Sequence, residues 1–150
     1  INHSLWDNTL EPDGCEGHAV RLGFRQIKRM KEEDAIWIIA TRGNGYSSIH
    51  DVWRRAGISQ NLLAYLAEAD VFFALGYSRR EALWEAKSIN SCKPLPLFSN
   101  DLGDEFIDEP VANLPIMTTG EEVIEDYAAL RFSLRAHPVA LLRSYLTPIH

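Results

Sequence analysis

The sequence is poor in the residues that cross-link small proteins or anchor them in membranes. It has two cysteines in 150 residues, Cys15 and Cys92, and they lie far apart. Such a pair gives no disulfide framework and is typical of a reducing compartment. No apolar run is long enough to cross a bilayer, and no signal-peptide pattern is present. We therefore expect a cytoplasmic protein with no membrane partner and, because the chain begins at Ile1, a piece of a longer protein.

Positive charge is also scarce, since 15 lysines and arginines face 21 acidic residues. This balance argues against a strong free-standing nucleic-acid binder. The distribution is uneven, however. Residues 21–55 carry eight basic and four acidic groups, whereas residues 94–150 carry three and nine. The pattern predicts a weak, locally basic contact surface in the first half of the chain.

The periodicity of apolar residues predicts a mainly α fold. Two extended segments, 2–10 and 17–26, flank a turn signal at 11–14 and predict a short N-terminal β-hairpin. Helices are expected over 32–42, 47–56, 60–69 and 78–89, then from Thr118 or Thr119 to His137, and over 139–145. The 32–42 helix should bury Ala35, Ile38 and Ile39, with Ile36 and Trp37 widening the buried face. The last long helix should present a stripe of Val123, Tyr127, Leu130 and Leu134, with Ile124 beside it.

Two segments of this helical region predict successive helix-hairpin-helix units. The first has its bend at residues 29–31 (the first bend) and the second at residues 57–59 (the second bend). Such a bend can present main-chain N–H groups and a helix N-terminus to a phosphate, which binds a nucleic-acid backbone without reading bases. The predicted duplex-DNA contacts are Arg25, Lys28, Arg29, Met30, Lys31, Arg42, Arg54, Arg55, Gly57, Ile58 and Ser59.

The chain is accordingly divided into four parts. Residues 1–27 are a β-hairpin lead-in, 21–91 the tandem helix-hairpin-helix domain, 92–117 an acidic Pro-rich linker and 118–150 a C-terminal helical segment.

Other polar clusters give no site for a metal or for chemistry. The Cys-Glu-Gly-His string at 15–18 lacks the second ligand pair that structural zinc needs. The linker carboxylates read as a solvated charge run rather than a two-metal site: Asp101, Asp104, Glu105, Asp108 and Glu109. We expect no catalytic residue, no metal and no cofactor in this chain. In the same linker, Leu95, Leu97 and Phe98 either dock in a partner groove or pack on the helical core.

Several blocks together resemble the bacterial C-family DNA polymerases, and more closely their error-prone branch, which acts in damage-induced translesion synthesis. The blocks are residues 19–28, 51–57, 66–72, 78–84 and 130–138. The resemblance covers nearly the whole chain. The strings Ser-Arg-Arg-Glu-Ala-Leu-Trp at 78–84 and Leu-Arg-Ala-His-Pro at 134–138 are specific to the error-prone branch.

The resemblance implies a position in a larger enzyme. This would be the tandem helix-hairpin-helix region that holds the primer–template duplex, ahead of an OB-fold, with the Mg²⁺-binding palm elsewhere in the parent polymerase. In the family the first bend usually carries glycine where this chain has Arg29, which demands a strained turn or adds a basic contact. Replicative relatives carry a sliding-clamp motif, Gln-Leu-x-Leu-Phe, which is similar to residues 94–98 here, but Pro94 replaces the glutamine. Clamp binding is therefore a minority hypothesis, beside accessory translesion proteins.

Two other functions stay open at this point. The chain is a protein-interaction scaffold of the same polymerase without direct DNA contact, or it is the DNA-binding domain of a repair nuclease. The family blocks argue against the nuclease.

Overall fold

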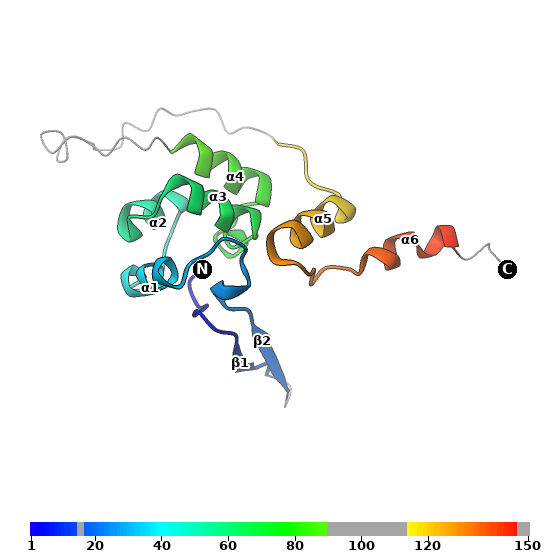
Figure 1. The fold of residues 1–150 in the computed structure, drawn as a ribbon, viewed down its shortest axis with the longest axis horizontal. Coiled ribbons are helices and arrows are strands. Elements are labelled where there is room, and N and C mark those ends of the chain that lie inside the picture. The colour runs from blue at the N-terminus through cyan, green and yellow to red at the C-terminus, as the bar shows by residue number, and fades with distance from the viewer. Residues whose placement is uncertain (15–16, 90–113, 147–150) are drawn as a thin grey trace, which may run out of the picture.

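The computed structural model describes residues 1–14, 17–89 and 114–146. The chain is mainly helical, as predicted, and Figure 1 shows a helical body with a β-hairpin at one side and two C-terminal helices at another. The elements are β1 Thr9–Pro12, β2 His18–Arg21, the 3-10 turn η1 Phe24–Gln26, α1 Glu32–Thr41, α2 Ile49–Ala56, α3 Gln60–Glu68, the 3-10 turn η2 Phe73–Leu75, α4 Arg79–Ser88, α5 Thr119–Leu130 and α6 Pro138–Leu146.

The N-terminal hairpin is antiparallel and shorter than predicted. Thr9 pairs with Arg21 and Pro12 with His18, so residues 2–8 and 22–26 lie outside the ladder. Beyond β2 the chain crosses its own N-terminal segment at Gly23, where an added Cβ would lie 2.2 Å from the Trp6 carbonyl oxygen. This crossing turns the next residues into η1 rather than a longer strand.

One core joins η1 to helices α1–α4. Its largest fully buried side chains come from η1, helices α1–α3 and the segment after α3, and α4 adds Ala82 and Ala86: Phe24, Ile38, Ile49, Val52, Leu63, Leu66 and Phe72. Each such burial contributes roughly 1.5–3 kcal/mol. The packing of apolar faces therefore fixes where the bends between the helices lie.

Helix α1 confirms the predicted span but has a narrower buried face. Ala35 and Ile38 are fully buried, whereas Ile36 and Trp37 are 54% and 62% exposed. Successive helical residues turn by about 100°, so residues 36 and 37 face away from the side that holds 35 and 38. The prediction that they widen the buried face was wrong.

Serine side chains cap the next three helices. Ser48, Ser59 and Ser78 each accept a hydrogen bond from the main-chain amide three residues on. At Ser78 the Glu81 side chain bonds back to the Ser78 amide, which confirms the predicted capping box. These caps satisfy amides that would otherwise lack partners.

The closest helix pair in the body is α3 with α4, and α2 packs on α3 less extensively. The bend between α3 and α4 contains Asp70 with φ 57° and Gly76 with φ 90°. The second helix-hairpin-helix unit was predicted across α2 and α3. The packing shows that α3 forms its main hairpin with the helix that follows it.

Helix α5 begins at a capping box formed by Thr118 and Glu121. It ends at Leu130 rather than at His137, because Arg131 adopts a left-handed φ of 73°. The predicted stripe was right for Val123 and for Leu130, which is half-buried against the core, and wrong for Tyr127 and Leu134. The buried face consists of Val123, Asp126 and Ala129, while Ile124 and Leu134 are mostly exposed and Tyr127 lies at the surface.

Helix α6 starts at Pro138, a residue suited to the first helical position, and projects away from the body (Figure 1). Its apolar side chains are exposed, Tyr145 at 77% and Leu142 at 53%. Within the described ranges, no helix has the length and apolar character needed to span a membrane.

Candidate nucleic-acid interface

The first bend connects η1 to α1 and has a left-handed residue at Arg29, with φ 65°. A non-glycine residue in this conformation costs roughly 1–2 kcal/mol. The Arg29 guanidinium lies 5.2 Å from the centre of the Tyr65 ring, a cation–π contact that offsets part of this cost. Met30 is 9% exposed and fixes the bend to the core. Arg29 thus occupies a left-handed position where glycine is expected, and its contact with Tyr65 helps to stabilise that conformation.

The N-terminus of α1 has no side-chain cap. Lys31 occupies the cap position without a side-chain hydrogen bond, and it is exposed together with Glu32 and Glu33. Among the described residues, none accepts a hydrogen bond from the amides of Glu32, Glu33 or Asp34. These amides and the helix dipole favour an anion. The three acidic side chains of the same turn oppose a second negative charge, which makes the site weak.

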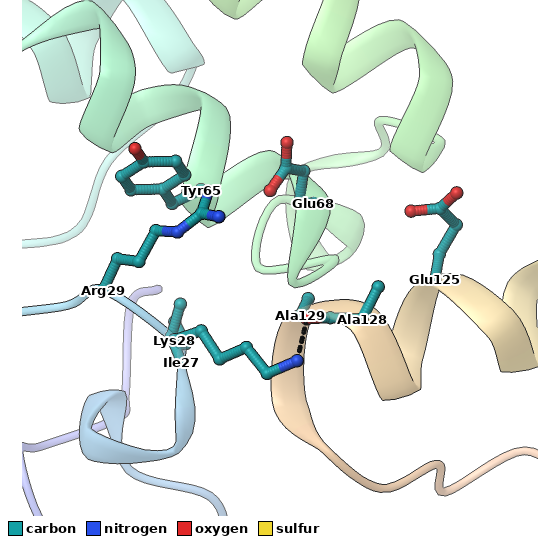
Figure 2. Close-up of a pocket in the computed structure, with 8 residues that line it drawn as sticks. All are labelled: Ile27, Lys28, Arg29, Tyr65, Glu68, Glu125, Ala128 and Ala129. Atoms are coloured by element: carbon teal, nitrogen blue, oxygen red, sulfur yellow. Dashed lines mark hydrogen bonds between the residues drawn. The ribbon is translucent and has the colours of Figure 1, made fainter.

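Lys28, next to the first bend, is occupied by helix α5. Its main-chain amide donates to the Ala129 carbonyl oxygen at 3.0 Å, and its ammonium group donates to the carbonyl oxygens of Tyr127 and Ala128 at 3.2 and 2.5 Å. Figure 2 shows this side chain reaching across to the end of α5. Lys28 therefore caps the C-terminus of α5, where a cation is favoured.

A groove of about 250 Å³ lies between the first bend, α3 and α5 (Figure 2). Its charged lining mixes Lys28 and Arg29 with Glu68 and Glu125. Because Glu68 and Glu125 add negative charge beside Lys28 and Arg29, the groove does not form a purely basic phosphate site.

The second bend is more closed than the first. Gly57 is left-handed with φ 62°, and its amide donates to the Trp53 carbonyl oxygen at 3.0 Å. Ile58 is 7% exposed and belongs to the core. Ser59 caps α3 by accepting from the Leu62 amide. This bend can offer few donors beyond the first amides of α3, although Arg54 beside it is exposed.

Two arginines predicted to contact phosphate bond main-chain carbonyl oxygens of this chain. Arg55 donates to the carbonyl oxygens of Thr41, Arg42 and Gly45 at 2.6, 2.6 and 2.9 Å. Arg42 donates to the carbonyl oxygens of Asn2 and Ser4. Donors that satisfy main-chain carbonyls are costly to redirect. These side chains are therefore not available to phosphate while they bond the main chain.

The remaining predicted cations are accessible. Arg25 forms an exposed ion pair with Asp7, of a kind that contributes little stability and exchanges readily. The side chains of Arg54 and Lys31 form no hydrogen bond or ion pair with the described part of the chain. Leu95, Leu97, Phe98 and the linker carboxylates lie outside the described residues, as do Cys15 and Glu16.

A family model described as a helix-hairpin-helix motif matches residues 1–82. The chain belongs to the helix-hairpin-helix family. It is also similar to the error-prone DNA polymerase of Ruegeria pomeroyi, at 52% identity over 95% of this chain and 13% of that protein. Error-prone DNA polymerase 1 of Rhizobium meliloti is 42% identical over 95% of this chain and 15% of that protein. Error-prone DNA polymerase 2 of Agrobacterium fabrum is 44% identical over 98% of this chain and 14% of that protein. No solved structure matches.

These relatives confirm the resemblance read from the sequence blocks. The chain spans about one seventh of the curated relatives it matches. The match extends from residue 1 into α4, so both bends and most of the body core fall inside the helix-hairpin-helix region. Helices α5 and α6 lie beyond it.

Sequence reasoning missed a buried group of charges that joins α5 to the helix-hairpin-helix body. We call it the arginine–carboxylate cluster; it consists of Asp70, Arg79, Glu122, Asp126 and Arg135. Arg79 is 4% exposed and bonds Asp126, while Arg135 bonds Asp70 at 2.5 Å. The signal was present, because both polymerase-specific blocks, 78–84 and 134–138, contain one of the arginines.

The cluster is charged and only partly hydrogen-bonded. Arg79 Nη2 lies 3.4 Å from Glu122 Oε2, yet that oxygen and Arg79 Nε have no hydrogen-bond partner among the residues that the structure describes. Burial raises the pKa of the Asp70 carboxyl above its usual 3.8, although Arg79 and Arg135 act in the opposite direction. Three carboxylates against two guanidinium groups leave this junction dependent on each arginine.

Proposed function

We propose that this chain contacts the sugar-phosphate backbone of duplex DNA as part of an error-prone DNA-directed DNA polymerase that acts in translesion synthesis in the cytoplasm. The observation that carries the proposal is the uncapped N-terminus of α1, which follows the first bend beside exposed Arg29 and Lys31. The helix-hairpin-helix match and the names of the similar proteins support it.

The chemistry of the contact is simple. The first amides of α1 donate to phosphate oxygens, and Arg29 and Lys31 add charge-assisted contacts. The acidic first turn keeps the affinity low, which suits a region that must let the duplex advance. Because amides and lysines reach phosphates rather than base edges, binding should not depend on sequence.

The second bend would supply a weaker contact through the first amides of α3, with exposed Arg54 nearby. In this assignment Ile58 acts through its main chain only, since its side chain is buried, and Met30 adds no free donor because its amide bonds the Ile27 carbonyl oxygen at 3.3 Å. Arg25 contributes when its exposed pair with Asp7 opens.

Nucleotide addition would take place elsewhere in the longer protein, with Mg²⁺ supplied there. Among the described residues, no three His, Cys, Asp or Glu side chains come together as a metal site requires. The role proposed for this chain is therefore to hold the duplex, not to carry out the chemistry.

A salt titration with a fluorescent duplex tests the proposal. The logarithm of the binding constant should fall linearly with the logarithm of salt concentration, with a slope of about −0.9 for each phosphate neutralised. Replacing Arg29 and Lys31 by glutamine should make the slope shallower by up to about 1.8. Lys87→Gln, which removes an exposed cation outside both bends, is the matched control and should leave the slope unchanged.

The second candidate is a protein-interaction scaffold, and the exposed apolar side chains of α1 and α6 favour it. Trp37 is 62% exposed and Tyr145 77%. A flat salt response together with capture of other parts of the polymerase, or of accessory translesion proteins or the sliding clamp, would support the scaffold and remove the DNA contact.

A further inference from the structure

Carbonyl oxygens at the C-terminus of α5 accept hydrogen bonds from donors next to the first bend. Three successive carbonyl oxygens, those of Tyr127, Ala128 and Ala129, accept from the Lys28 ammonium and amide groups. A helix C-terminus carries partial negative charge, so it competes with phosphate for the same cation. As long as α5 is docked, Lys28 is withheld from DNA.

Helix α5 also brings negative charge to the groove beside the bend. Glu125 of α5 and Glu68 of α3 line the groove together with Lys28 and Arg29 (Figure 2). The docked helix thus both removes a cation and adds a carboxylate where a phosphate would approach. Both effects weaken DNA binding.

Both apolar packing and charges hold α5 in place. Only Val123, Asp126 and Ala129 of this helix are buried. Its other strong contacts run through the arginine–carboxylate cluster, to Arg79 from the body and to Arg135 from the segment after α5. Ala129 and Leu130 of α5 pack against the body core, but the largest fully buried side chains all lie before α4, so α5 can detach while these stay packed.

We propose that α5 is an autoinhibitory latch on the first bend. In the docked state it sequesters Lys28, and its release frees the Lys28 amide and ammonium groups for one more phosphate contact. The inference rests on the proposed DNA contact at the first bend and adds a regulation to it. The closing element is the arginine–carboxylate cluster, whose rupture converts a weak duplex contact into a stronger one.

The test uses release variants of the whole chain. Arg135→Glu leaves Arg79 to face four carboxylates, and Asp126→Arg places a cation against Arg79; either change should detach α5. Hydrogen exchange of the Lys28 amide, followed by NMR, reports the release directly. That amide should exchange slowly in the parent chain and faster in both variants, while circular dichroism confirms that the body stays folded.

Duplex titration then measures the consequence. The release variants should bind more tightly, with a salt slope steeper by about 0.9, the value for one added phosphate contact. Lys87→Gln, which removes an exposed cation outside both bends, should leave the slope unchanged in the parent chain and in the release variants. Lys28→Gln in the Arg135→Glu background should abolish the gain.

Three results would overturn the latch. The first is Lys28 exchange that stays slow in both variants. The second is released α5 with unchanged or weaker binding, which would make α5 a support of the bend. The third is a gain in the Arg135→Glu variant that Lys28→Gln leaves intact. Failure of the proposed function is distinguishable, because then no variant shows a salt-dependent interaction although Lys28 exchange still reports the state of α5.

Discussion

Replacing Arg79 by methionine is the sharpest test of how this fold is held together. The guanidinium is 4% exposed, bonds Asp126, and lies 3.4 Å from Glu122 and 3.9 Å from Asp70. Methionine keeps much of the length and apolar surface of the stem but removes the charge. Three carboxylates would then share Arg135, which is itself 38% exposed.

The expected cost follows from the desolvation of the remaining charges. Removing one partner of a buried ion pair typically costs about 3–5 kcal/mol, because the other charge stays buried without compensation. A domain of this size is stable by about 5–15 kcal/mol in total. Arg79→Met should therefore take away a large share of the free energy of unfolding, while a domain with average stability stays folded at low temperature.

Urea unfolding followed by tryptophan fluorescence gives the measurement, since Trp6 and Trp53 pack against the core. The matched control is Arg80→Met. Arg80 is the neighbouring arginine and forms a surface pair with Glu121 at 3.2 Å, which predicts a loss below about 1 kcal/mol. Equal effects of the two substitutions, or a loss under about 1 kcal/mol for Arg79→Met, would refute the claim that the cluster is desolvated and holds α5.

Four further predictions concern left-handed residues, a helix cap and pH. Arg131→Gly should raise the free energy of unfolding by about 1 kcal/mol in urea denaturation, because it relieves a left-handed residue with φ 73°, whereas Gly57→Ala at φ 62° should lower it by about 1–2 kcal/mol. Ser59→Ala should cost about 1 kcal/mol through the lost cap of α3, measured in the same way; no change would mean that water replaces the cap. Hydrogen bonds from the Thr118 amide and hydroxyl, with Arg80 nearby, hold the pKa of Glu121 below 4.5. The contribution of Glu121 to stability is therefore complete above pH 4.5 and is lost as the pH falls through the lower folded-state pKa. Glu121→Gln should make unfolding curves less dependent on pH in that acid range.

Local signals predicted most of the helices within one to three residues. Capping serines and the period of apolar residues depend only on neighbours a few positions away, and α2, α3 and α4 begin next to their capping serines. The errors have a common cause. Ile36 and Trp37 are apolar but turned outward, and the end of α5 depends on the backbone of Arg131, which no periodicity reveals.

The site residues were harder to predict than the fold, because the type of a charged residue does not indicate which group its side chain will bond. Lys28, Arg42 and Arg55 looked like phosphate contacts in the sequence, yet each bonds main-chain carbonyl oxygens of this chain. Those carbonyls come from segments up to about 100 positions away. The blocks around Arg79 and Arg135 were noticed as family features, but only their packing shows that they form one cluster.

The crossing at Gly23 has an evolutionary consequence. The Trp6 oxygen and the Asp7 carbonyl carbon stand 2.2 and 2.4 Å from where any side chain would begin, and both are rigid main-chain atoms. Codon randomisation at this position, screened for folded product, should return a single amino acid, whereas Gly57 and Gly76 have open space around them and should tolerate replacements at a cost in conformation only. At Gly23, where the chain passes the main chain of Trp6 and Asp7, lack of space alone thus excludes any side chain.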